Sequence, residues 1–279
     1  MKLEITTLVE NRSGEDHQLQ PEHGLSFFVK AGNTTVLFDT GASAKFIRNA
    51  ELLAIDLSEV DQVLISHGHY DHSGGYKAFV EQAFNRDAKL VVKPGFFNKK
   101  YGLSGNHSEY LGNGFDREAL VAAGVTIEIV HADVKEVAPG VFSVSGFERT
   151  CPMEQLNPRF RVERDGAQVM DEFCDEQAMV VTSEKGLVVV LGCSHPGLIN
   201  ILNTIKSRFK EKIYAVVGGT HLVEANRERL EKTMDYLLDQ NIPVIGISHC
   251  SGGGDHIRYM KSRLGNRFSH NCTGTRFEV

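Results

Sequence analysis

The densest group of reactive side chains lies in one short stretch, where His67, His69, Asp71 and His72 fall within six residues. Imidazole together with carboxylate is a ligand set that favours zinc, with iron and manganese as alternatives. In an extended chain, side chains two positions apart point the same way, so we expect His67 and His69 to bind one ion. Asp71 and His72 fall on the turn that follows, and we expect them to bind a second ion nearby.

Three more histidines, His195, His221 and His249, each follow an apolar run where a strand is expected to end. In α/β sheets, ligands bind beyond the carboxyl ends of the strands. Four strands that each deliver histidine to one edge therefore predict a single site. We assign His195 and His249 as the later ligands, one for each ion, while His221 competes for either role.

Periodicity places these residues among alternating strands and helices. An apolar stripe at helical spacing, from Tyr76 to Phe84, follows the first motif. Helices are also expected at 42–53 and 116–123 and after His195 and His221. Strands are expected at 1–9, 25–29, 34–38, 60–65, 89–93, 125–130, 141–145, 177–182, 187–191, 213–217, 243–247 and 275–279.

Two long segments show no regular pattern. Residues 94–113 are rich in glycine and aromatic side chains, which is typical of a lid or substrate-facing loop and also of a disordered insertion. Residues 150–175 carry Arg159, Arg161 and Arg164 and are interpreted as either a solvated connection or an anion-binding flap. The polar stretch 11–24 is expected to be a loop whose histidines bind no metal, although they could border the site.

Composition and charge limit the classes of protein that fit. With 41% hydrophobic and 24% charged residues, the chain is ordinary for one globular domain over 1–279, with halves at about 1–150 and 176–279. The net charge of −6 argues against nucleic-acid binding by bulk attraction. The five cysteines form no C-x-x-C pair and no apolar signal segment begins the chain, so we expect a cytoplasmic protein. No apolar run approaches membrane-span length, and the sequence makes no prediction of oligomeric state.

The motif H-x-H-x-D-H after a strand resembles the metal-binding signature of the metallo-β-lactamase superfamily. Together with Gly-Cys-Ser-His-Pro-Gly, Gly-Gly-Thr-His-Leu and Ser-His-Cys-Ser-Gly, it makes the chain similar to one branch. That branch holds archaeal and bacterial proteins similar to a methanopterin-pathway dihydropteroate synthase. The resemblance implies an α/β fold, a four-layer αββα sandwich of two related halves, with zinc, one or two ions, at one edge.

The resemblance also implies roles for single residues. Asp39, at a strand end before glycine, is expected to orient a ligand histidine, since a ligating imidazole needs an acceptor on its other nitrogen. Cys193 stands where many relatives place an aspartate that bridges both metals. Its thiolate either binds zinc or the side chain only packs against its neighbours. The loop of His221 resembles one that supplies a catalytic histidine, so we expect Asp71 and His221 to take part in the reaction and His249 to be the last ligand.

Three functions follow, each on a small-molecule substrate that could carry phosphate. The first is a hydrolase in which metal-activated water attacks an ester, phosphoester or lactone. The second, implied by the resemblance, is a transferase that releases pyrophosphate as an aniline-like amine attacks a pterin methylene, with phosphates held by 93–100 and 159–164. The third is a di-iron redox or metal-sensing protein, which His69 disfavours because such relatives carry an acidic residue there.

Overall fold

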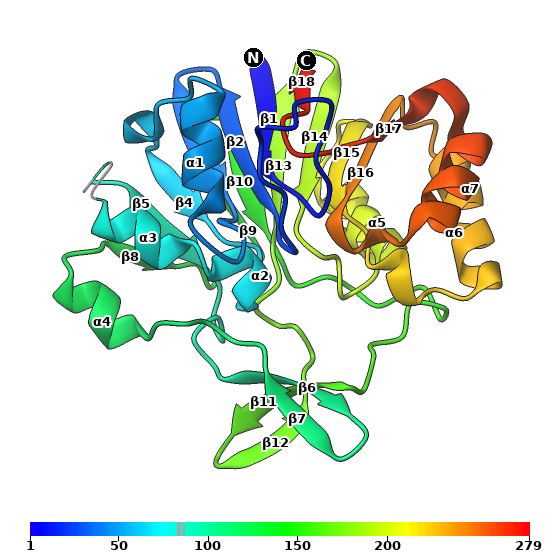
Figure 1. The fold of residues 1–279 in the computed structure, drawn as a ribbon. Helices are drawn as coiled ribbons and strands as arrows, with labels where there is room; N and C mark the ends of the chain where they lie inside the picture. Colours follow the sequence, from blue (N-terminus) through cyan, green and yellow to red (C-terminus); the bar gives the residue numbers. More distant parts are fainter. Residues whose placement is uncertain (83–84, 86) are drawn as a thin grey trace.

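The computed structural model describes residues 1–82, 85 and 87–279, and its strands form two large sheets and one small sheet in that part of the chain. The first large sheet has the strand order β18-β1-β2-β3-β4-β5-β8 and brings the two termini together, because β1 pairs with β18 (Figure 1). Its strands are β1 (Leu3–Val9), β2 (Ser26–Ala31), β3 (Thr34–Phe38), β4 (Gln62–Leu64), β5 (Lys89–Val92), β8 (Ile127–Ile129) and β18 (Arg276–Glu278).

The second large sheet has the order β17-β16-β15-β14-β13-β10-β9. The two sheets do not follow the predicted halves, because β9 and β10 precede residue 150 yet join the second sheet, and the C-terminal β18 joins the first. The strand β9 was not predicted. The strands are β9 (Val134–Ala138), β10 (Val141–Val144), β13 (Ala178–Ser183), β14 (Gly186–Leu191), β15 (Ile213–Gly219), β16 (Val244–Ser248) and β17 (Phe268–His270).

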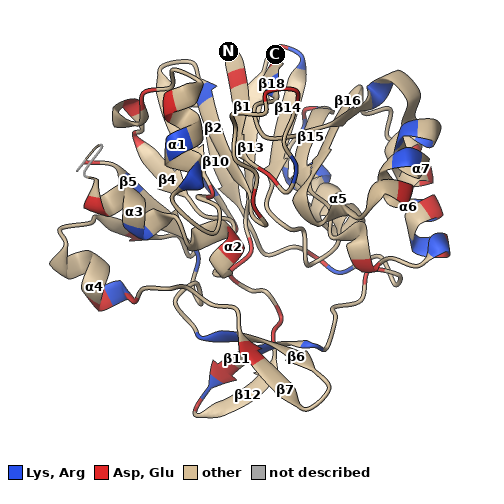
Figure 2. Ribbon diagram, viewed as in Figure 1, with Lys and Arg blue, Asp and Glu red and all other residues tan. Residues whose placement is uncertain are grey.

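Helices cover the outer faces of both sheets (Figure 1). On the first sheet lie α1 (Lys45–Leu52) and α3 (Tyr76–Glu81), and on the second lie α5 (Leu198–Arg208), α6 (Arg227–Asp239) and α7 (Gly254–Leu264). Acidic and basic residues mix on the outer faces of α6 and α7 (Figure 2). The sequence did not predict α7, and Ala83 and Phe84 of the predicted helix lie outside the described residues. Shorter helices are α2 (Tyr70–Ser73), α4 (Arg117–Ala122), η1 (Leu57–Glu59), η2 (Leu222–Glu224), η3 (His249–Ser251) and η4 (Gly265–Arg267).

Three buried apolar clusters separate these layers. One joins the helices around Phe46 to the first sheet, one fills the space between the sheets around Val91 and Val190, and one joins the second sheet to Leu202 and Met234. A helix or sheet must bury its apolar face against a neighbour, so three clusters require four layers. The predicted α/β fold, a four-layer αββα sandwich, is therefore confirmed. Across the described residues, no helix has the length and apolar character needed to cross a membrane.

The two segments predicted as irregular, 94–113 and 150–175, instead form a third sheet with the order β12-β11-β6-β7. These strands were not predicted because every residue of β7 and β12 is exposed. Neither strand therefore shows the alternation of apolar and polar residues by which strands are predicted. The hairpin β11–β12 turns through Asp165-Gly166, both at positive φ, which is a strong hairpin signal. Its strands are β6 (Lys100–Ser104), β7 (His107–Tyr110), β11 (Phe160–Arg164) and β12 (Ala167–Met170).

Candidate metal centre

The ends of parallel strands supply the side chains of the site. Asp39 follows β3, the first motif follows β4, and His195, His221 and His249 follow β14, β15 and β16. The strands β3 and β4 are parallel, as are β14, β15 and β16, so their carboxyl ends meet at one edge. The helix α2, which carries part of the first motif, lies between that edge and the third sheet (Figure 1).

One set of ligand atoms belongs to His67, His69 and His195, which we call the first group. The ligand atoms lie within 4.8 Å of one another, and His67 Nε2 is 3.0 Å from His69 Nδ1. All three side chains are buried, and among the residues that the structure describes the Nε2 atoms of His69 and His195 have no hydrogen-bond partner. Burial and neighbouring positive groups lower the pKa of each imidazole, which favours its neutral form. Neutral, converging and unpaired ring nitrogens are what a bound cation requires.

Aromatic rings and a buried ion pair support the first group. The ring of Phe173 stacks on His195 with centroids 3.9 Å apart, and it meets His67 and His69 edge-on. The Gly68 N–H, between two ligands, donates to Asp175 Oδ2 at 2.8 Å, and Lys100 Nζ donates to Asp175 Oδ1 at 2.6 Å. Because Lys100 lies on β6, this ion pair joins the third sheet directly to the loop that carries His67 and His69.

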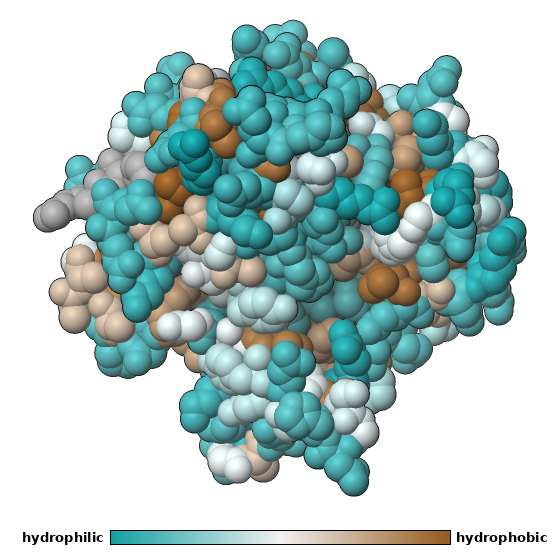
Figure 3. Space-filling model, in the orientation of Figure 1, coloured by the Kyte–Doolittle hydropathy of each residue, from teal (hydrophilic) through white to brown (hydrophobic). Residues whose placement is uncertain are grey.

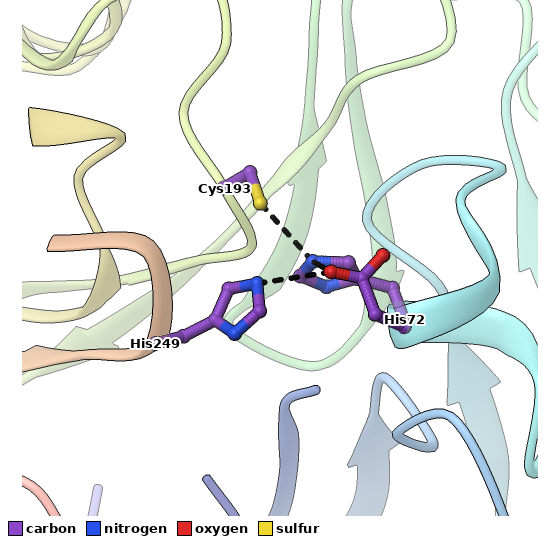
Figure 4. A group of neighbouring side chains, drawn as sticks. His72, Cys193 and His249 are labelled. Atoms are coloured by element: carbon purple, nitrogen blue, oxygen red, sulfur yellow. Dashed lines mark hydrogen bonds and ion pairs between the residues drawn. The ribbon is translucent and has the colours of Figure 1, made fainter. Parts of the chain in front are cut away.

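A second set of ligand atoms belongs to Asp71, His72, Cys193 and His249, which we call the second group. His249 Nε2 lies 3.2 Å from Asp71 Oδ2, and His72 Nε2 lies 3.2 Å from Cys193 Sγ. Figure 4 shows Cys193 and His249 reaching His72 and its neighbouring carboxylate from separate loops. Imidazole, carboxylate and thiol together suit zinc.

Polar residues behind the second group hold its imidazoles in place. Asp39 Oδ2 lies 2.6 Å from His72 Nδ1, which is the orienting position that the sequence analysis assigned to it. Burial lowers the pKa of His72, but Asp39 and Asp71 outweigh it and raise the pKa to about 9. The same carboxylates would attract a cation. Asn11 Oδ1 lies 2.9 Å from His249 Nδ1, and Glu10 accepts a hydrogen bond from the His249 N–H at 3.0 Å.

His221 lies beside both groups. Its ring is 4.3 Å from that of His195, and its Nε2 is 3.4 Å from Glu224 Oε2. Burial lowers the pKa of His221, but the neighbouring Cys250 thiol and Glu224 carboxylate outweigh it and raise the pKa to about 9. His23 borders the site with Nε2 3.3 Å from Asp71 Oδ2, whereas His17 is exposed.

Backbone strain is concentrated in these loops. Of the eight non-glycine residues with positive φ in the described chain, five lie at the site: Asp39, Phe173, Ser194, His221 and His249. Such conformations are sparsely populated and persist where the surroundings enforce them, which is typical of functional sites. Glu176 provides one such support, because it accepts hydrogen bonds from the Ser194 and His195 N–H groups.

Members of both groups line one cavity of about 500 Å³: His69 and His195 from the first, and Asp71, Cys193 and His249 from the second. The molecular surface is hollowed where the third sheet meets the body (Figure 3). Arg12, Arg159 and Phe160 are also in the lining, so Arg159 is the arginine of 159–164 that reaches the cavity. The expectation that the lysines of 93–100 hold phosphate is wrong, because Lys100 is buried in ion pairs with Asp171 and Asp175, Lys99 pairs with Glu163, and Lys93 donates to a carbonyl.

Sequence reasoning missed several residues that contact the two groups. Glu10 and Asn11 follow directly after β1, so the strand-end argument could have found them. Phe160 and Phe173 lie in the segment interpreted as irregular, and no local pattern points to them. Cys250 adjoins a predicted ligand, yet its contact with Cys193 spans 57 positions of sequence.

Comparison with known proteins agrees with this geometry. Residues 19–147 match the model of the metallo-beta-lactamase superfamily, and the chain belongs to that superfamily. It is 30% identical over 269 residues to 7,8-dihydropterin-6-methyl-4-(beta-D-ribofuranosyl)-aminobenzene-5'-phosphate synthase of Methanocaldococcus jannaschii, covering 90% of this chain and 88% of the relative.

Two solved structures show the same architecture. A crystal structure of a metal-dependent hydrolase of the beta-lactamase superfamily is 31% identical, covers 99% of both chains and has a TM-score of 0.85. Zinc-bound PqqB from Methylobacterium extorquens shares the fold at 12% identity, with coverage of 99% and 100% and a TM-score of 0.62. The predicted family is thereby confirmed.

Proposed function

We propose that this chain is a metal-dependent hydrolase that acts on an ester, phosphoester or lactone of a small molecule. One observation carries the proposal: two groups of buried ligand atoms line a single cavity of about 500 Å³. Cavities of roughly 300–1,000 Å³ are typical of small-molecule sites. The five free cysteines fit the reducing cytoplasm, where we propose that the protein acts.

The two ligand groups, Asp71 and His221 have separate roles in the proposed reaction. The first and second groups would each hold one cation, with zinc as the proposed metal and Cys193 as a ligand of the second. Bound cations would polarise the target oxygen and lower the pKa of water. Asp71 lines the cavity and is proposed to accept a proton from the attacking water. His221 lies on the cavity wall beside both groups, where it can donate a proton to the leaving group.

A direct test is a screen of model phosphodiesters, lactones and thioesters with zinc-loaded protein. We expect turnover of at least one class, and we expect the His221→Ala variant to retain both ions while turning that substrate over more slowly. A zinc-loaded protein that hydrolyses none of the three classes would contradict the proposal. Iron in the purified protein together with no hydrolysis would favour the redox alternative.

The second candidate is a pyrophosphate-releasing transferase on a pterin substrate. The relative named as a synthase, aligned over 90% of this chain, favours it. Arg12 and Arg159 line the same cavity and could hold phosphate groups, since guanidinium pairs well with phosphate oxygens. Pyrophosphate released only when a pterin diphosphate and an arylamine are both present would support the transferase over the hydrolase.

A further inference from the structure

A third set of ligand atoms lies beside the second group, and the proposed reaction gives no role to one of its members, Cys250. It consists of Cys193, His221 and Cys250, all buried, with ligand atoms within 4.8 Å of one another. We call it the third group. The Cys250 thiol lies 3.3 Å from the Cys193 carbonyl oxygen, and the His221 N–H donates to Cys250 Sγ at 3.2 Å. Backbone contacts therefore hold the Cys250 sulfur beside Cys193 and His221.

The imidazole of His221 is the observation that points to a ligand. Its side chain is buried, with the whole residue 8% exposed. Within the described structure neither ring nitrogen completes a well-aligned hydrogen bond, and Nε2 has only a 3.4 Å ion-pair contact with Glu224 Oε2. Burying a polar group without a partner costs free energy, so such a group calls for an explanation. The left-handed backbone of His221, at φ 47°, is a further cost at the same residue. A cation bound at a ring nitrogen would account for both.

The space for Cys250 depends on a glycine. A Cβ atom at Gly219, in the last position of β15, would lie 2.9 Å from Cys250 Sγ and 2.3 Å from the Gly192 carbonyl oxygen. Any larger residue at this position would collide with the Cys250 sulfur and with the Gly192 carbonyl oxygen. The close approach of β15 to its neighbours therefore keeps the two thiols together.

We propose that Cys193, His221 and Cys250 bind a thiophilic divalent cation of the zinc and cadmium class, in addition to the cations of the first and second groups. Thiolate ligands select soft metals, and imidazole suits zinc. Zinc lies about 2.3 Å from sulfur and about 2.0 Å from nitrogen, so the ligand atoms of a tetrahedral site are roughly 3.5–3.8 Å apart. The three ligand atoms here all lie within 4.8 Å of one another, so small side-chain movements would bring them to that spacing. Three protein ligands leave a fourth position open to the cavity.

Cys193 is shared between two sites. Its sulfur lies 3.2 Å from His72 Nε2, on the side of the second group, and a thiolate sulfur has lone pairs enough to contact two cations. The third group is therefore expected to bind its cation only after the first and second groups have bound theirs. If the proposed function holds, a cation there would occupy the His221 imidazole, and excess zinc would inhibit turnover. That consequence rests on the proposed function, whereas binding itself does not.

The test is a cadmium titration of the purified full-length chain, followed by the ultraviolet charge-transfer absorption of cadmium thiolates. We expect the wild type to bind one equivalent beyond those of the first and second groups and to show the absorption of two thiolates. Cys250→Ser should lose that equivalent and the absorption of one thiolate. Cys174→Ser, which removes an exposed thiol outside the cluster, should match the wild type.

His221→Ala gives an independent check, because it keeps both thiols and should still lose the last equivalent of cadmium. Equal cadmium stoichiometry and equal absorption in the wild type, Cys250→Ser and His221→Ala would overturn the proposal. If the two variants lose the last equivalent of cadmium but the wild type hydrolyses no substrate, the cation site is supported and the proposed function is contradicted. The two proposals can therefore fail separately.

Discussion

The first and second groups lie side by side at one sheet edge, but they place negative charge differently. The first group consists of imidazoles alone, and behind its ligands the carboxylates of Asp175 and Glu176 accept hydrogen bonds from the backbone N–H groups of Gly68 and His195. The second group has the Asp71 carboxylate and the Cys193 thiol among its own ligand atoms. A cation in the second group would be neutralised by its own ligands. A cation in the first group would instead depend on carboxylates that lie behind the imidazoles and do not bind it.

The surroundings of the two groups differ in the same sense. Phe160 and Phe173, on or beside the third sheet, pack against the imidazoles of the first group. The second group instead faces the loop after β1, where Asn11 and His23 contact His249 and Asp71. Changes in the third sheet should therefore act on the first group, and changes in the β1 loop on the second.

The largest expected effect is the loss of a ligand from the first group. His67→Ala should remove the first ion and lower turnover by about three orders of magnitude or more, since metal polarisation contributes several kcal/mol at the transition state. Asp71→Ala should mainly remove the second ion. Zinc content and kcat measured on both variants decide the assignment, with His17→Ala as an exposed control. Equal loss of both ions in His67→Ala and Asp71→Ala would show that the groups are not separate sites.

The next largest effect separates His221 from the ligands. His221→Ala should keep the ions of the first and second groups and lower kcat by about 10²–10⁴-fold, the usual range for a lost acid–base group. His195→Ala and His249→Ala should lose metal along with activity. If His221→Ala loses one of these ions while His249→Ala keeps both, the roles of His221 and His249 must be exchanged.

A smaller effect is expected from the thiol of the second group. Cys193→Ser should weaken the second ion, and Cys193→Asp should restore it, because a carboxylate supplies a charged oxygen ligand at the same place. Chelator competition on the zinc-loaded variants measures the affinity. Unchanged affinity in both variants would mean that Cys193 only packs.

The smallest effect tests the support behind the first group. Lys100→Met leaves Asp171 and Asp175 without their ammonium partner and should weaken the first ion by about 10–100-fold, as is usual when residues behind the ligands are changed. The neighbouring Lys99→Met removes an exposed ion pair and should leave zinc affinity unchanged. A weakened second ion with an intact first ion in Lys100→Met would contradict the comparison.

The sequence predicted the parts of this site that local patterns encode. The histidines at strand ends each follow an apolar run and come directly after serine or threonine, so their shared edge followed from the α/β pattern alone. The third sheet escaped prediction because its outer strands are exposed and carry no apolar alternation. Cys250 escaped because its contact with Cys193 joins positions far apart in sequence. Pairing across such distances is set by tertiary packing, which no local pattern records.

The most direct test of the central claim is elemental analysis of protein purified without chelator, with activity measured on the same preparation. The two ligand groups predict between one and two equivalents of a transition metal per chain, mostly zinc. Removing the metal with a chelator should abolish activity, and adding zinc back should restore it. A metal-free protein that remains fully active would contradict the account.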